Sequence, residues 1–398
     1  MENIAAVSKP LRYRWVILAL CAACFLFTFI TRFTWPPLIP VVVPVLGMKM
    51  SQAGAFMSAF YIGYVITQIP AGVLADRFGV RLILAGSLIL EGISTSALGY
   101  ISTYEMGFNL RILSGLGAGA VFASCSRALM EWFPENERGR AFGVFLAAPS
   151  GGILMTNLMV PPLNQALGWN GAFQAVGSLT IIAGVMVFLF MRSAEEIKGE
   201  DKSLLSGLKI FFSGRNLILT ALAGFCLMWL ELGMATWANA YIKKLGFSVT
   251  AAGQVMVFYG IGGVLAPLVS GFVSDLTGQR KWLIITAYLA VIPLTVIFGY
   301  QKDLTMLSVL GFVLGFCSYV ANPQLTVLIS QFAGKEWAAT ANGVSNFMFQ
   351  LASLISPWLI GMVIDVTGNF SWVWFIMAAG PLLGLILMLP VKEAGARA

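Results

Sequence analysis

Six charged side chains lie inside long apolar stretches, and they are the residues of this sequence best suited to chemistry. They are Arg32, Glu91, Arg111, Arg127, Glu131 and Glu231. A charge at the centre of a membrane span costs about 2.5 to 3.5 kcal/mol on insertion scales, so each charge invites a functional explanation. A deep guanidinium can bind a carboxylate or phosphate through its planar fork. Because the sequence contains no histidine, any proton that the protein handles must travel on a carboxylate, a tyrosine or water.

The composition places these charges in a bilayer. Of the 398 residues, 59% are hydrophobic and only 10% are charged, which excludes a soluble globule of ordinary composition. A span needs roughly 20 apolar residues, so the chain can hold about a dozen helices with short loops. The first apolar run is too long for a cleaved signal peptide and is expected to be a retained span. The sequence predicts twelve spans near residues 14–40, 51–75, 81–101, 106–132, 140–164, 171–192, 216–242, 250–274, 282–300, 304–331, 338–364 and 371–390.

A ten-residue polar motif after the second span returns once in the chain. It begins at Gly72 and again at Gly271, and the offset is 271 − 72 = 199 residues, which is half the chain. The chain is therefore predicted to contain two copies of one membrane unit, 1–192 and 215–398, joined by a cytoplasmic linker at 193–214. Within the motif, the glycines suit close helix approach or positive φ, and Asp76 suits the positive end of a helix. We expect gating or structural roles for Gly72, Asp76, Arg77, Gly79, Arg81, Gly271, Asp275, Gly278 and Arg280, and structural roles for Glu91 and Arg111.

This motif, Gly-x-x-x-Asp-Arg-x-Gly-x-Arg, resembles the signature loop of the major facilitator superfamily. Span four adds Arg111 followed by Gly115, Gly117 and Gly119, which is similar to the arginine-then-glycine pattern of that superfamily. The resemblance implies an all-α membrane protein with twelve transmembrane helices in two pseudo-symmetric six-helix bundles. It also implies transport by alternating access, with the aspartate loops latching the cytoplasmic side when the site faces outward.

The end of span four narrows the resemblance. Arg127 is followed by Trp132, Phe133 and Pro134 and then by a Glu-Arg pair, a pattern similar to the anion:cation symporter branch, whose members carry sugar acids, organophosphates and other organic anions. Organophosphate exchangers have a second deep arginine in span seven, where this chain has Glu231. That difference argues against phosphate exchange as the function and favours a carboxylate substrate with proton symport.

The repeat relates two of the deep charges. Since 32 + 199 = 231, Glu231 occupies in the second half the position of Arg32 in the first. If the halves face each other across a cavity, an anion anchor at Arg32 lies opposite a proton carrier at Glu231. A fixed ion pair of Glu231 with Arg32 or with another arginine remains the alternative. The apolar neighbours of Glu231 disfavour its charged form, whereas a nearby arginine would favour it.

Further residues complete the predicted site. Arg127 is an auxiliary cation and Glu131 an auxiliary proton group, although their i, i+4 spacing also suits a local salt bridge. Glu91 is expected to pair with Arg111. Trp35, at a Trp-Pro-Pro sequence expected to disturb the helix after Arg32, is a candidate substrate contact. Tyr319, Asn322 and Gln324 in span ten are also candidate contacts, or they satisfy one another between helices.

Lysine and arginine set the orientation. They are abundant in the terminal segments and the even-numbered connections and rare on the opposite face, which predicts both termini in the cytoplasm of an inner-membrane protein. Most of the net charge of +7 then comes from the lysines and arginines that set the orientation in the membrane. Nucleic acid is therefore not an expected partner. The linker is expected to end in an amphipathic surface helix at 204–212. The sequence contains no Walker lysine motif, zinc-ligand cluster or nucleophile elbow, so we expect no enzyme activity, cofactor or metal site.

The function predicted from the sequence is import of a small organic anion by proton symport through a monomer in the lipid bilayer. A monocarboxylate, a dicarboxylate or a sugar acid would fit. One rival is a proton-driven exporter of lipophilic cations, which Glu231 could bind but the deep arginines would repel. A second rival is a receptor that binds a ligand without moving it, although the linker and short tails leave no room for an output domain.

Overall fold

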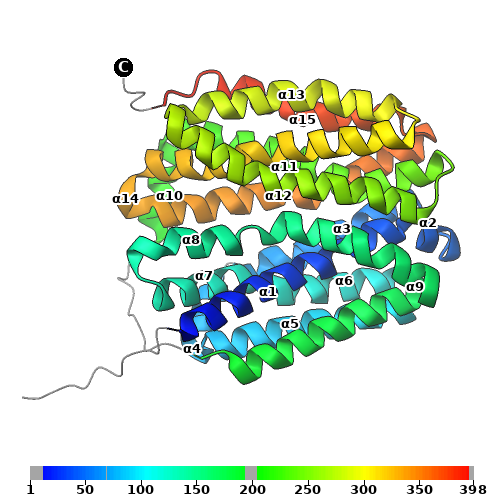
Figure 1. Cartoon of the computed structure of the whole chain (residues 1–398), viewed down its shortest axis with the longest axis horizontal. Coiled ribbons are helices and arrows are strands. Elements are labelled where there is room, and N and C mark those ends of the chain that lie inside the picture. Colours follow the sequence, from blue (N-terminus) through cyan, green and yellow to red (C-terminus); the bar gives the residue numbers. More distant parts are fainter. Residues whose placement is uncertain (1–11, 69, 193–203, 394–398) are drawn as a thin grey trace, which may run out of the picture.

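A computed structural model of the chain describes residues 12–68, 70–192 and 204–393, which together we call the described part. Every regular element in it is helical (Figure 1). The helices are α1 (Tyr13–Phe33), α2 (Trp35–Val45), α3 (Met50–Gln68), α4 (Ala71–Phe78), α5 (Val80–Ala97), α6 (Tyr104–Ala118), α7 (Val121–Trp132), α8 (Glu135–Phe145), α9 (Ala148–Phe190), α10 (Leu204–Ser213), α11 (Arg215–Lys244), α12 (Val249–Thr277), α13 (Arg280–Tyr300), α14 (Leu304–Thr367) and α15 (Ser371–Met388), with a short 3-10 helix at Leu98–Tyr100.

The helices group into the twelve predicted spans. Ten helical stretches of the described part are long and apolar enough to cross a membrane. One of these stretches divides into two spans at Gly168, where φ is 71°, and the span formed by α3 and α4 completes the set. Gly334, with φ of 75°, separates the two spans within α14. Glycine adopts positive φ at little steric cost, which is why α9 and α14 each change direction at a glycine.

The first span is interrupted where the sequence predicts it. α1 ends at Phe33 and α2 begins at Trp35, so the proline pair occupies the first turn of a new helix. Proline is tolerated there because the amide hydrogen that it lacks has no partner within the helix. The expected disturbance beside Arg32 is thus confirmed.

The two halves repeat in three dimensions as they do in sequence. Gly63 on α3 lies against the Ile112 carbonyl of α6, and Gly262 on α12 lies against the Phe312 carbonyl of α14. The motif glycines Gly79 and Gly278 both have positive φ, at 79° and 67°. Equivalent glycines therefore make equivalent close approaches in both bundles, and the motif glycines share a positive φ although their ψ angles differ, at 147° and 6°.

These contacts allow a stability test. A Cβ at Gly63 would lie 2.0 Å from the Ile112 carbonyl oxygen, whereas a Cβ at Gly86 on α5 would meet nothing within 4 Å. We expect Gly63→Ala to destabilise the first bundle by about 1 to 3 kcal/mol through overpacking. Gly86→Ala should be neutral or slightly stabilising because alanine is the better helix former. Thermal unfolding of the two variants in detergent checks this, and equal melting temperatures would refute the close approach.

The bundles have two distinct ends (Figure 1). We call the end where α1 and α11 begin and α15 finishes the terminal end, and the end that contains Val45 and Lys244 the loop end. The predicted helix after the linker is present as α10. Its Phe211 is buried in a cluster with Leu217 and Ile329, so α10 packs on the second bundle.

At the loop end the two halves meet closely. The Asp365 carboxylate, at the end of α14, accepts hydrogen bonds from the backbone amides of Met50 and Ser51 at 2.8 Å each. Those amides open α3, so a carboxylate of one half caps a helix of the other. Deeper in the interface, Asn239 donates to Asn157 at 3.0 Å. The hydrogen bonds that Asp365 and Asn239 make to the other half lie on this side, so the two halves are joined at the loop end.

The Asp365 cap gives a second prediction. We expect Asp365→Ala to increase amide hydrogen exchange in the first turn of α3 and in the α9 segment around Asn157, since the halves separate more often. Asp303 is a matched control because it caps Met306 of its own half at the same end of the molecule. Its alanine variant should affect only the start of α14. If Asp365→Ala alters α3 alone, the cap is local and does not hold the halves together.

Candidate functional site

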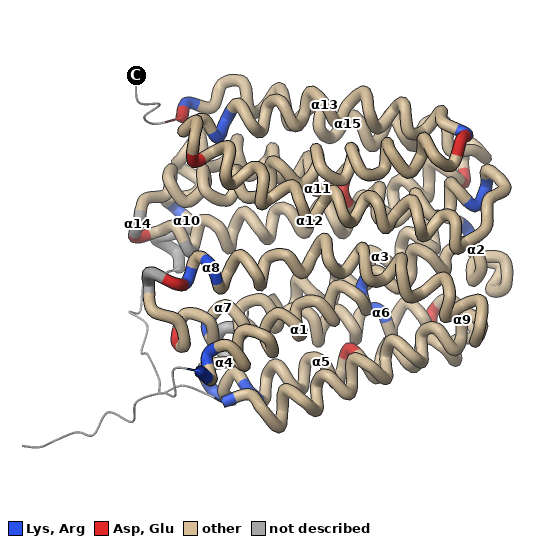
Figure 2. The backbone as a smooth tube through the Cα atoms, in the orientation of Figure 1, with Lys and Arg blue, Asp and Glu red and all other residues tan. Residues whose placement is uncertain are grey.

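Charged residues gather at both ends of the bundles and are sparse between them (Figure 2). This distribution follows from the desolvation penalty of a charge at membrane depth. The described part nevertheless buries Arg32, Glu91, Arg111 and Glu231. Their partners decide which of them are structural and which are available to a ligand.

Arg32 lies near the end of α1 with 2% of its surface exposed. Its guanidinium carbon is 4.3 Å from the ring centre of Phe29 and 4.8 Å from that of Phe60. The rings of Tyr61 and Tyr64 lie at 5.1 and 4.9 Å. A cation–π contact contributes about 0.5 to 2 kcal/mol, so these rings offset part of the cost of burying the charge.

The polar edge of Arg32 is not saturated. Its Nε and Nη2 atoms are buried and have no hydrogen-bond partner among the described residues. A buried donor without a partner costs about 1 to 3 kcal/mol, and more when it is charged. The aromatic residues therefore surround the cation, while Nε and Nη2 are left without a partner among the described residues.

Glu231 lies in the middle of α11 with 4% of its surface exposed. Its Oε1 accepts a hydrogen bond of 2.9 Å from the Asn322 side chain of α14. No lysine or arginine of the described part forms an ion pair with it. The alternative of a fixed pair between Arg32 and Glu231 is therefore wrong for this conformation.

The predicted pair of Glu91 and Arg111 is also wrong. Arg111 instead donates to backbone carbonyls, from Nε to Phe56 at 3.1 Å and from Nη2 to Arg32 at 3.0 Å. Glu91 accepts hydrogen bonds from Thr28 and Thr31 of α1. The residue types alone favoured a salt bridge, but the carbonyl groups released where α1 ends at Phe33 provide better-placed acceptors for Arg111.

Arg127 and Glu131 form the local salt bridge that their spacing allowed. The Nε to Oε1 distance is 2.7 Å along α7, and 24% of the Arg127 side chain is exposed against 5% of the Glu131 side chain. Both residues make further interactions. The pair lies on α7, the part of the fourth span that is closer to the terminal end.

The other predicted substrate contacts differ in their surroundings. Trp35 is fully buried, donates from Nε1 to the Ala53 carbonyl at 2.8 Å and packs on Phe56. Its polar atom is thus already satisfied, and we leave it out of the proposed site. Gln324 is turned toward α12, where it donates to the Ser270 carbonyl at 3.1 Å. Tyr319 remains close to the Glu231 region through its contact with Tyr259.

The repeated motif lies at the terminal end. Arg77 and Asp275 are exposed there, and Arg81 donates to the Phe188 carbonyl of α9. In the second copy, the backbone amide of Arg280 donates to Glu393 at 3.1 Å. The side chain of Asp76 and the surroundings of Gly72 lie outside the described part, and a Cβ at Gly271 would meet nothing within 4 Å.

Several partners of the deep charges were not predicted. The aromatic residues around Arg32 come from two helices, and only Phe29, three residues away on the same helix, had a sequence signal by spacing. Phe60, Tyr61 and Tyr64 are brought to Arg32 by the packing of α3. The cross-half pair of Asn157 and Asn239 likewise depends on the docking of the two bundles.

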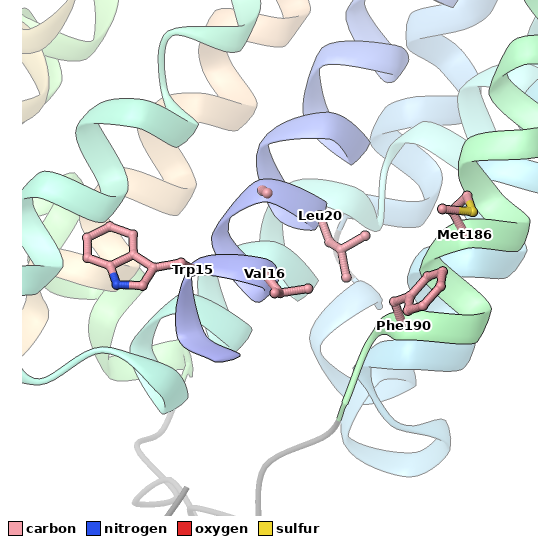
Figure 3. A pocket seen from close by; sticks show the side chains of 6 residues that line it. Trp15, Val16, Leu20, Met186 and Phe190 are labelled. Carbon is pink, nitrogen blue, oxygen red and sulfur yellow. The ribbon is translucent and has the colours of Figure 1, made fainter. Parts of the chain in front are cut away.

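One depression of the described surface lies away from these charges. It measures about 580 Å³ and lies between α1 and α9, lined by Trp15, Val16, Leu20, Met186 and Phe190 (Figure 3). Apolar side chains that face outward from a transmembrane bundle are expected to contact lipid. We therefore interpret this depression as part of the lipid-facing surface.

Comparison with known proteins agrees with this architecture. The family model of the Major Facilitator Superfamily matches residues 20–357 and 234–398. The chain is 27% identical to the probable galactarate/D-glucarate transporter GudP of Bacillus subtilis, covering 87% of this chain and 86% of the relative. It is 26% identical to the probable sulfoacetate transporter SauU of Cupriavidus necator, covering 95% and 93% of the two chains.

A solved structure gives the same fold. A bacterial homologue of the human lysosomal transporter Spinster, in an inward-facing and unoccupied conformation, superposes with a TM-score of 0.78 at 17% identity, over 96% of this chain and 95% of the other. The two six-helix bundles, the repeated loop motif and the matched family model lead to one conclusion. The chain belongs to the major facilitator superfamily, a family of transporters rather than enzymes.

Proposed function

We propose that this protein imports a small organic anion together with protons by alternating access. The observation that supports the proposal most is the guanidinium of Arg32, which is buried among four aromatic rings with two nitrogens unpartnered. A structural arginine would be expected to saturate its donors, as Arg111 does. An anion with a planar carboxylate, or a similar oxyanion, would complete the hydrogen bonding of Arg32.

Glu231 supplies the proposed proton site. It accepts a hydrogen bond from a neutral amide and has no cationic partner in the described part. An unpaired carboxylate is costly at membrane depth, so proton uptake before reorientation would lower the barrier to moving the site. Arg127 and Glu131 remain candidate auxiliary groups along the path from the terminal end.

The substrate class follows from the site and from the relatives. Arg32 offers one deep cation without a carboxylate partner, which matches the carboxylate or sulfonate group of the compounds named for the two relatives. Asn322 and Tyr319 would meet hydroxyl groups of a sugar acid. We therefore favour a monocarboxylate, a dicarboxylate or a sugar acid over a phosphate ester.

The proposed orientation places the terminal end in the cytoplasm of the inner membrane. Lysine and arginine are more frequent at that end than at the loop end (Figure 2), in keeping with the positive-inside rule. The structure would then be inward-facing, with the Asp365 cap closing the outer side. We place the first bundle within 1–192, the linker at 193–214 and the second bundle within 215–398, in one monomeric transport unit.

A binding experiment tests the proposal. Purified protein is heated with galactarate, D-glucarate, sulfoacetate or D-glucuronate, and in parallel with quaternary amines. A ligand that binds the native state raises the melting temperature. We expect an increase with at least one anion that disappears in Arg32→Gln. An increase only with amines would instead support the rival reading, a proton-driven exporter of lipophilic cations that uses Glu231.

A further inference from the structure

Among the described residues, Glu91 is the deep carboxylate to which the proposed cycle assigns no role. It lies on α5 and is fully buried. Thr28 Oγ1 donates to its Oε1 at 3.0 Å, and Thr31 Oγ1 lies 2.8 Å from its Oε2. The two threonines are three residues apart on α1, so one face of that helix holds both carboxylate oxygens.

The Thr31 hydroxyl has two acceptors within reach. Besides Glu91, its Oγ1 is 3.0 Å from the backbone carbonyl of Thr28. A hydroxyl has one hydrogen to donate, so it serves one acceptor at a time. With Glu91 ionised, Thr31 donates to the carboxylate. With Glu91 protonated, the acid donates to Thr31 Oγ1, and the Thr31 hydrogen turns to the Thr28 carbonyl.

Each carboxyl oxygen of Glu91 thus keeps a hydrogen-bond partner in both protonation states without movement of a heavy atom. A carboxylate held by a salt bridge lacks this property, because loss of its charge leaves the buried cation unpaired. The arrangement around Glu91 therefore suits a group that gains and releases a proton rather than a fixed structural charge.

The charged residues around Glu91 do not fix it in one protonation state through an ion pair. The elements that pack on α5 are α1, α4, α6, α7, α9 and the 3-10 helix at Leu98–Tyr100. At the depth of Glu91, α1 contributes Arg32 and α6 contributes Arg111, and neither forms an ion pair with it. The remaining titratable residues of the elements packed against α5 are Tyr13, Arg14, Cys21 and Cys24 on α1, Tyr104 and Glu105 on α6, Cys125, Arg127 and Glu131 on α7, Asp76 and Arg77 on α4, and Tyr100 in the 3-10 helix, with none on α9.

We infer that Glu91 is a second proton-binding group of the transporter, linked to the Arg32 anchor through α1. This inference rests on the proposed function for its role in transport, but proton binding by Glu91 can be tested without it. Thr28, Thr31 and Arg32 lie within two turns of one helix, and Arg111 holds the carbonyls of Thr31 and Arg32 at 3.4 and 3.0 Å. Protonation of Glu91 removes a negative charge beside the segment that positions the anion anchor.

Infrared spectroscopy of the reconstituted full chain tests proton binding with no substrate present. The carbonyl stretch of a neutral carboxylic acid is followed as the pH is varied. We expect a titrating component that is missing in Glu91→Gln and retained in Glu231→Gln. Identical titrations of the wild type and Glu91→Gln would overturn the inference.

A second pair of variants covers the case in which Glu91→Gln folds poorly. Thr31→Val removes the switching hydroxyl and should shift the midpoint of the Glu91 component. Thr180→Val on α9 is the matched control, because the Thr180 hydroxyl is buried but bonds only to the Val176 carbonyl. A midpoint that does not move in Thr31→Val would contradict the proposed exchange of hydrogen bonds.

A transport assay tests whether proton binding by Glu91 is coupled to movement of the substrate. In liposomes, Glu91→Gln should exchange D-glucarate across the membrane while a proton gradient no longer stimulates net uptake as in the wild type. Unchanged stimulation would overturn the coupling role. If no anion of the panel moves even with the wild type, the proposed function fails, and the infrared titration still decides whether Glu91 binds a proton.

Discussion

Replacing Arg32 with lysine should weaken substrate binding by roughly tenfold to a hundredfold. Lysine keeps the positive charge but loses the planar fork, so one charge-assisted hydrogen bond of about 1.5 to 3 kcal/mol is lost. The ammonium group would also fit poorly among the rings of Phe29, Phe60, Tyr61 and Tyr64, which surround a flat guanidinium. The concentration dependence of D-glucarate or galactarate uptake into liposomes measures the loss.

Arg140→Lys is the control for this substitution. Arg140 is exposed on α8, so its replacement should leave uptake unchanged. Thermal unfolding of both variants without substrate shows whether the fold persists. If Arg32→Lys transports with unchanged affinity, Arg32 is not the anion anchor, and the proposed site must lie elsewhere.

Replacing Glu231 with glutamine should abolish uphill accumulation while leaving exchange of substrate intact. Glutamine still accepts the hydrogen bond that Asn322 donates to Glu231, but it cannot carry a proton. An inward gradient of one pH unit supplies about 1.4 kcal/mol per proton, enough for roughly tenfold accumulation by the wild type. The variant should equilibrate substrate to a ratio near one under the same gradient.

The comparison of net uptake with counterflow separates coupling from binding. Glu105→Gln serves as the control, because Glu105 is an exposed carboxylate at the loop end. It should accumulate substrate as the wild type does. Tenfold accumulation by Glu231→Gln would exclude Glu231 as an obligatory proton carrier, and loss of exchange would assign it to substrate binding instead.

The sequence was sufficient for the architecture. Hydropathy located the spans because a bilayer forces backbone hydrogen bonds into helices of nearly fixed length. The 199-residue offset predicted the equivalence of the bundles, and the proline pair after Trp35 predicted the break in the first span. Each of these signals is local or periodic, so no knowledge of tertiary contacts was needed.

The partners of the buried charges could not be predicted in the same way. Arg111 and Glu91 have complementary charges, which predicted an ion pair, but Arg111 donates to backbone carbonyls of α1 and α3, and Glu91 accepts from threonine hydroxyls. Which backbone carbonyls can accept a further hydrogen bond from another helix depends on where helices end and on how they pack. The i, i+4 pair of Arg127 and Glu131 was accessible because both residues lie on one helix.

The most direct test of the central claim uses protein in liposomes that contain a pH-sensitive dye. The liposomes are challenged with galactarate, D-glucarate, sulfoacetate and D-glucuronate, and then with quaternary amines. We predict lumenal acidification with at least one anion, abolished in Glu231→Gln and requiring higher anion concentrations in Arg32→Lys. Proton movement with the amines alone would contradict the account and identify the protein as a cation exporter.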